Sequence, residues 1–121
     1  MRRHRRDYRG RGYLARMLNP LLLILMQNGP AHVYTLLSQI EKFGFKNIDP
    51  SMVYRSMRQM EMQGIVESAW DETETQGPPR RVYHLTPFGN ERLNDYIEDL
   101  KDTREMIDSI SDVYDEHMNK R

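Results

Sequence analysis

The last third of the chain, residues 86–121, places the strongest constraint on the fold, because it contains no helix-breaking residue after Gly89. Thr86 suits a helix N-cap, and Pro87 suits the first helical position. Apolar residues then recur at helical spacing, which predicts one helix that runs to about Asn119. A helix of about 33 residues is about 50 Å long, which is longer than a domain of this size can cover.

One face of this predicted helix is apolar and the other face is charged. The pattern favours a dimerisation helix that packs on a second copy of the chain. The alternative, a surface helix on its own core, is weaker because too little protein remains to cover the apolar face. The residues expected to form the dimer contact are Leu93, Tyr96, Ile97, Leu100, Ile107, Ile110 and Tyr114.

A shorter helix is predicted between Asp49 and Gly64. Asp49 suits the N-cap, Pro50 suits the first helical position, and Gly64 suits the left-handed position that ends many helices. The side chains expected to face the core are those of Val53, Met57, Met60 and Met62. The opposite face carries short polar, aromatic and guanidinium groups, and it is predicted to lie in a groove of DNA. Its residues are Ser51, Met52, Tyr54, Arg55 and Arg58.

Two helices are predicted before this one. Residues 13–28 form the first in two pieces, with Asn19 as a cap and Pro20 opening the main piece. Residues 31–43 form the second, and a glycine-bearing turn separates it from Asp49. Two helices joined by such a turn, the second with a polar outer face, are typical of a helix-turn-helix.

Beyond Gly64, the segments 65–70 and 80–85 are rich in strand-forming residues, and an acidic loop with Gly-Pro-Pro joins them over 71–79. This pattern predicts a projecting β-hairpin, or wing. Arg80 and Arg81 at its base are expected to contact the DNA backbone, whereas the acidic loop argues against base recognition by the tip. The predicted fold is mainly α with a small β-hairpin: a winged helix-turn-helix over 13–85, then a C-terminal dimerisation helix over 86–121.

The net charge of zero conceals an uneven distribution. Residues 1–16 carry seven arginines and one aspartate, a balance of +6, whereas residues 86–121 carry five bases and ten acids, a balance of −5. Residues 1–12 are expected to form a flexible arm that contacts phosphates, in preference to a tail that only aids solubility. The arginines of this arm are Arg2, Arg3, Arg5, Arg6, Arg9 and Arg11.

Several function classes receive no support from the sequence. The chain has no cysteine, which excludes disulfides and thiolate metal sites, and its four histidines share no metal-ligand spacing. No apolar run approaches the roughly 18 residues of a membrane span. No nucleophile stands beside a histidine, and no glycine-rich phosphate loop is present. We therefore expect a cytoplasmic protein that is not an enzyme, uses no cofactor and binds no membrane.

Three segments together resemble the PadR-like family of bacterial transcription regulators. They are GPAHVYTLLSQIE (29–41), DPSMVYRSMRQMEMQGIVES (49–68) and GPPRRVYHLTPFG (77–89). The resemblance covers about 20–93, and the single last helix is similar to that of the shorter subfamily. It implies a homodimeric repressor of a promoter, often relieved by a small molecule. It also implies that the helix of Tyr54 enters the major groove, while Tyr34 and the wing arginines contact the backbone or position that helix.

Trp70, the only tryptophan, has two interpretations. It stacks on a planar aromatic effector in a pocket at the dimer centre, or it is a hairpin residue packed on the last helix, which we favour. Two other functions also stay open. One is a dimeric protein-interaction module without specific DNA binding, and the other is a non-specific DNA-coating protein that uses the basic arm.

Overall fold

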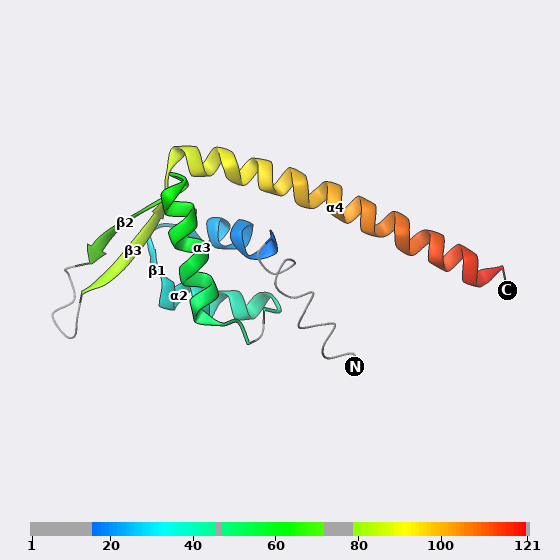
Figure 1. Cartoon of the computed structure of the whole chain (residues 1–121), viewed down its shortest axis with the longest axis horizontal. Helices are drawn as coiled ribbons and strands as arrows, with labels where there is room; N and C mark the ends of the chain where they lie inside the picture. Colours follow the sequence, from blue (N-terminus) through cyan, green and yellow to red (C-terminus); the bar gives the residue numbers. More distant parts are fainter. Residues whose placement is uncertain (1–15, 46, 72–78, 121) are drawn as a thin grey trace.

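The computed structural model of the chain describes residues 16–45, 47–71 and 79–120, and Figure 1 shows how its elements are arranged. Residues 16–26 form the first helix. The later elements are β1 (Ala31–His32), α2 (Val33–Ile40), the 3-10 turn η1 (Glu41–Phe43), α3 (Pro50–Met62), β2 (Val66–Asp71), β3 (Arg80–Leu85) and α4 (Pro87–Asn119). The predicted class, mainly α with a small hairpin and a long last helix, is confirmed, and a third strand is added to the hairpin.

The third strand is β1, in a segment that the sequence analysis assigned to a helix. The sheet is antiparallel in the order β1-β3-β2, and Ala31 and His32 pair with Tyr83 and Val82. The prediction of one helix over 31–43 is therefore wrong at both ends. His32 is extended and immediately precedes α2, and residues 41–43 form the 3-10 turn that Gly44 ends with a φ of 90°.

The first helix runs through Pro20 without a break, so the prediction of two pieces is wrong. Asn19 lies inside the helix, and its Oδ1 is buried with no hydrogen-bond partner among the described residues. A proline within a helix removes one backbone hydrogen bond. Here Pro20 is buried between Leu18 and Leu22, which are fully buried, so packing against the core offsets that loss.

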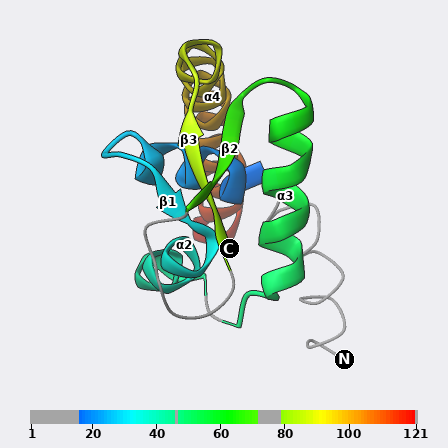
Figure 2. The same ribbon diagram turned by 90° about the vertical axis from the view of Figure 1, so that its left-hand side faces the viewer.

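The core lies between the first helix, α2, α3, the sheet and the beginning of α4. Figure 2 shows the hairpin and α3 next to each other, with α4 running behind them. The fully buried side chains are Leu18, Leu22, Leu23, Leu36, Ile40, Val53, Met57 and Val66. The prediction that Met62 faces this core is wrong, because its side chain is 82% exposed. Met62 is two residues after the buried Met60, a rotation of about 200°, which turns it to the other side of α3.

The predicted ends of α3 are confirmed. The Asp49 carboxylate accepts a hydrogen bond from the Ser51 backbone N–H at 3.0 Å, and Pro50 follows as the first helical residue. Gly64 adopts a φ of 78°, and the Ile65 N–H donates to the Met60 carbonyl at 2.9 Å. This is the Schellman arrangement, in which a left-handed residue ends the helix and turns the chain into β2.

The junction between α3 and α4 is closely packed. The Thr86 hydroxyl oxygen accepts a hydrogen bond from the Gly89 N–H at 2.9 Å, as the predicted N-cap should, and lies 2.6 Å from the Gly64 carbonyl oxygen, to which it donates. A Cβ atom on Gly89 would lie 2.0 Å from the carbonyl oxygen of Ile65. Glycine at this position therefore allows α4 to begin directly against the turn that ends α3.

Along α4 the environment changes. Leu93 is 4% exposed within the chain's own core, which leaves it little surface for a partner, and Tyr96 and Ile97 are half-buried against that core. From residue 104 to the end of the helix every residue is exposed. Figure 1 shows this part of α4 leaving the body of the molecule. None of the helices in the described ranges combines the length and apolar character that crossing a membrane requires.

Candidate nucleic-acid interface

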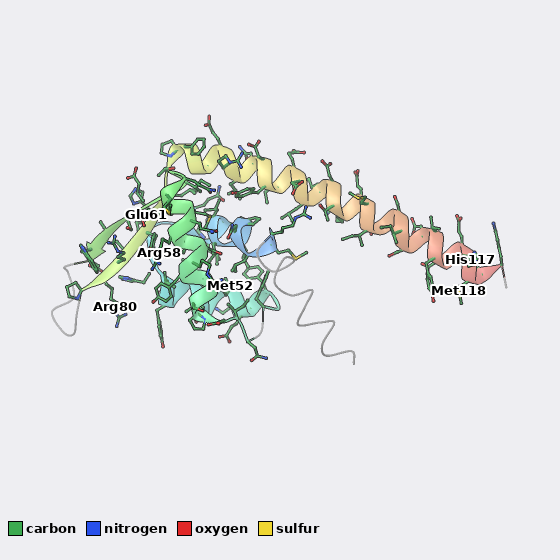
Figure 3. The ribbon with its side chains drawn as sticks, viewed as in Figure 1. Met52, Arg58, Glu61, Arg80, His117 and Met118 are labelled. Atoms are coloured by element: carbon green, nitrogen blue, oxygen red, sulfur yellow. The ribbon has the colours of Figure 1, made fainter. Side chains whose placement is uncertain are left out.

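The outward face of α3 carries the exposed side chains of Ser51, Tyr54, Arg55 and Arg58. Their spacing of three or four residues keeps them on one side of the helix, as predicted. Met52 differs from that prediction, since it is half-buried and packs against the core. Figure 3 shows Arg58 on the side of α3 nearest the hairpin and Met52 on the other side.

The charge on this face is mainly positive. Neither Arg55 nor Arg58 forms an ion pair within the part of the chain that the structure describes. Asp49 is the nearby acid at the start of α3, and hydrogen bonds from the backbone N–H and then the side chain of Ser51 lower its pKa below the ordinary value. Its negative charge is therefore retained to cap the helix, while the two guanidinium groups, about 1.7 and 2.5 turns later, remain available to an anion.

The hairpin supplies the other predicted arginines. Arg80 and Arg81 are both exposed at the loop end of β3, where they pair in register with Asp71 and Trp70 of β2. The Arg81 guanidinium donates a hydrogen bond to Ser68 Oγ at 2.7 Å and lies 4.6 Å from the centre of the Trp70 ring. Arg81 therefore has partners inside the chain. The predicted acidic tip falls largely within 72–78, outside the described residues.

A cavity of about 580 Å³ lies between the beginning of α2, the outward side of α3 and the hairpin. It brings together five predicted site residues that are distant in the sequence, Tyr34, Tyr54, Arg58, Arg80 and Arg81, while Ser51, Met52 and Arg55 lie outside its lining. Its other lining residues are His32, Val33, Glu61, Trp70, Pro79 and Tyr83. Three elements thus form one concave surface with three arginines and four aromatic rings.

Trp70 lines this cavity and is 57% exposed. It is four residues beyond Val66, which pairs with Leu85 next to α4, so about 13 Å of strand separates Trp70 from that helix. The favoured interpretation, a residue packed on the last helix, is therefore wrong. Trp70 lies beside α3 and under Arg81, because cross-strand pairing brings those two residues together.

The sequence analysis did not name four polar residues as site residues, two of which line this cavity and two of which contact its lining residues. Ser68 Oγ donates to Glu61 Oε2 at 2.5 Å, His32 Nε2 lies 3.1 Å from Asp71 Oδ2, and His32 Nδ1 lies 3.2 Å from the Arg81 carbonyl oxygen. The two-residue period of strands was a usable signal, since it puts Ser68 on the same face of the sheet as Trp70. His32 and Glu61 had no comparable signal, because their partners are set by tertiary packing.

Tyr83, a further lining residue, is 6% exposed at the back of the cavity. Burial raises the pKa of its hydroxyl above the ordinary value, and the nearby Glu61 carboxylate raises that pKa further. Tyr83 therefore stays protonated at neutral pH.

Comparison with known proteins identifies the family. The family model described as the transcriptional regulator PadR-like family matches residues 21–95, more than half of the chain. The chain belongs to this family. The PadR-like match includes α2, α3, the hairpin and the beginning of α4, and therefore every element that lines the cavity. None of the curated proteins compared with the chain matches it.

Solved structures of PadR-like proteins share the fold. A PadR family transcriptional regulator from Eggerthella lenta is 22% identical, with a TM-score of 0.71 over 91% of this chain and 96% of that one. A PadR-like transcriptional regulator from Bacillus cereus is 20% identical, with a TM-score of 0.65 over 77% and 89%. PadR of Bacillus subtilis, solved in complex with operator DNA, is 19% identical, with a TM-score of 0.60 over 67% of this chain and 46% of that one. These relatives are transcriptional regulators, not enzymes.

Proposed function

We propose that this PadR-like chain is a sequence-specific DNA-binding repressor that acts as a homodimer. The observation that carries the proposal is the single surface on which the exposed face of α3, the beginning of α2 and the hairpin present aromatic and guanidinium groups together. Bacillus subtilis PadR, a protein with this fold, has been solved in complex with operator DNA, which supports DNA binding by this chain.

In this proposal α3 lies in the major groove. Tyr54 and Arg55 face the base edges, where a guanidinium can donate two hydrogen bonds to guanine. Arg58 and Arg80 lie closer to the sugar-phosphate backbone, and phosphate contacts fix the orientation of a protein on DNA without specifying sequence. Tyr34, 73% exposed at the beginning of α2, donates its hydroxyl to a phosphate on the other side of α3. The arginines of residues 1–12 add phosphate contacts that weaken with added salt.

The dimer is proposed from the exposed half of α4. Six large apolar or aromatic residues there are between 40% and 67% exposed, and nothing in the described chain covers them. Contiguous apolar surface of this kind usually marks an interface. The residues are Met106, Ile107, Ile110, Val113, Tyr114 and Met118. A second copy of α4 would cover them and hold two α3 helices about 34–36 Å apart, one turn of DNA.

Relief of repression by a planar aromatic molecule is the further part of the proposal. A ligand that binds one spacing of the two α3 helices more tightly than another shifts the dimer toward that spacing. Since a repressor acts on the chromosome, we also propose a cytoplasmic location. To test the ligand, planar aromatic compounds are titrated into the protein–DNA complex, and release of DNA at a saturable concentration is expected. Complexes that persist at every concentration would contradict relief by such a ligand.

The first experiment is a binding titration on DNA from upstream of the chain's own gene and on a scrambled duplex, at two salt concentrations. We expect a preference of about a thousandfold or more for the upstream DNA near physiological salt. Arg55→Ala should reduce that preference by about tenfold or more, because one base contact is lost. Lys101→Ala, which removes an exposed cation from α4, is the matched control and should leave the preference unchanged.

Two outcomes would contradict a sequence-specific repressor. Equal and steeply salt-dependent binding to both duplexes would indicate a DNA-coating protein that depends on the basic arm. Binding to neither duplex would indicate a protein-interaction module.

A further inference from the structure

Glu61 is an acid that lines the cavity together with three arginines. It lies in the last turn of α3, three residues after Arg58, and Figure 3 shows both residues on the side of α3 nearest the hairpin. A carboxylate at a DNA-facing surface repels phosphate, so its presence calls for a structural reason. Its hydrogen bond with Ser68 of β2 supplies one.

Two hydrogen bonds in series connect three elements at this point. The Arg81 guanidinium of β3 donates to Ser68 Oγ at 2.7 Å, and the Ser68 hydroxyl donates to Glu61 Oε2 at 2.5 Å. A serine hydroxyl has one proton to donate and lone pairs to accept, so both bonds form at once. Each bond has a charged group at its outer end, which makes it stronger than a bond between neutral groups.

Arg81 is also held by two contacts that do not involve Ser68. Its guanidinium covers the Trp70 ring at 4.6 Å, and its carbonyl oxygen accepts a hydrogen bond from His32 Nδ1 at 3.2 Å. The side chain and the backbone of Arg81 therefore connect α3 with all three strands. We propose that Glu61, Ser68 and Arg81 form a latch that fixes the hairpin against α3, and that Glu61 and Ser68 are positioning residues for DNA recognition.

The latch rests on the proposed function and gives it a mechanical basis. A recognition helix and a hairpin that contact one DNA duplex bind best when their separation is already fixed. If it is not, ordering them on binding costs conformational entropy and lowers the affinity. In the latched state Arg81 acts within the protein, so it orients the hairpin rather than contacting phosphate. Loss of the latch is therefore expected to lower affinity for the specific site by about tenfold.

Trp70 makes the latch observable without DNA. It is the only tryptophan in the chain, and Arg81 covers one side of a ring that is otherwise largely exposed. Ser68→Ala removes the hydroxyl that connects Arg81 to Glu61, while Ser68→Thr keeps a hydroxyl and suits a strand. We expect Ser68→Ala to raise acrylamide quenching of Trp70 fluorescence by about half or more, and Ser68→Thr to restore the wild-type value.

Glu61→Gln tests the other end of the latch, at a half-buried position in the last turn of α3. It keeps an acceptor for Ser68 but removes the charge, so quenching of Trp70 should lie between that of the wild type and that of Ser68→Ala. Equal quenching in the wild type and Ser68→Ala would overturn the latch. Increased quenching with unchanged affinity for the upstream DNA would overturn its positioning role. Failure of the wild type itself to prefer that DNA would instead overturn the proposed function, because the quenching measurement does not depend on DNA.

Discussion

The two halves of α4 form one continuous helix but have different surroundings. Residues 87–103 begin against the end of α3 and bury Leu93 in the core. Asp99 and Thr103 in this half accept hydrogen bonds from the Arg16 guanidinium of the first helix. Residues 104–119 are exposed throughout. Since most helical stability in proteins comes from packing of an apolar face, the first half is stabilised by packing within the chain, whereas the second half gains no such packing from the described residues. The first half therefore belongs to the fold, and the second half is the part on which the proposed dimer rests.

The largest effect is expected from Gly89→Val, which disturbs the first half. The new Cβ would lie 2.0 Å from the Ile65 carbonyl oxygen, so α4 would have to move away from α3. We expect the free energy of unfolding to fall by at least about 3 kcal/mol, measured by urea denaturation. Glu91→Val adds the same side chain at an exposed position two residues later and should cost much less. An equal fall in the free energy of unfolding of the two variants would show that the close approach of Gly89 to Ile65 does not limit stability.

The next largest effect is expected from Ile110→Asp, which disturbs the second half. A charge in the exposed apolar face should prevent the helices of two copies from packing, because its desolvation is not compensated. Sedimentation should show a monomer where the wild type is a dimer, while circular dichroism shows an unchanged helical content. Ser109→Asp introduces the same group one residue earlier, outside the apolar face, and should stay dimeric. A monomeric wild type would show that the exposed half of α4 is not a dimer interface.

A smaller effect is expected from Thr86→Ala at the beginning of α4. This variant loses the cap on the Gly89 N–H and the hydrogen bond to Gly64, both in a buried position. The free energy of unfolding should fall by about 1–2 kcal/mol, and Thr86→Ser should recover most of it because the hydroxyl is kept. Thermal unfolding of the three proteins at one concentration measures the difference. An unchanged free energy of unfolding in Thr86→Ala would mean that packing alone holds α4 against the end of α3.

The sequence was most informative where the determinants are local. Asp49 with Pro50, and Thr86 with Pro87, begin α3 and α4 as predicted, and both caps act through residues within three positions. Strand β3 was also placed correctly, because its alternating pattern lies between a proline-rich loop and a cap. The outward face of α3 followed from helical spacing, with the exception of Met52 at its edge.

The features that the sequence did not predict depend on distant residues. Strand β1 has only two residues and exists because β3 pairs with it. The unbroken helix at Pro20 depends on burial against the core, and the place of Trp70 depends on Arg81 across the hairpin. The bonds among Glu61, Ser68 and Arg81 require three elements to meet, which no spacing within one segment reveals. Local sequence patterns thus predict the helices and strands, whereas the site depends on contacts between elements that are distant in the sequence.

The pairing of β1 with β3 has a consequence for how the protein is made. His32 and Arg81 are 49 residues apart in the chain, and β3 is the central strand of the sheet. A growing chain therefore completes α2 and α3 before β3, which pairs with both β1 and β2, leaves the ribosome. Contacts of such long separation form late in folding, because a large loop must close first. A chain truncated before Arg80 would leave both outer strands unpaired, and it would aggregate rather than act as a smaller regulator.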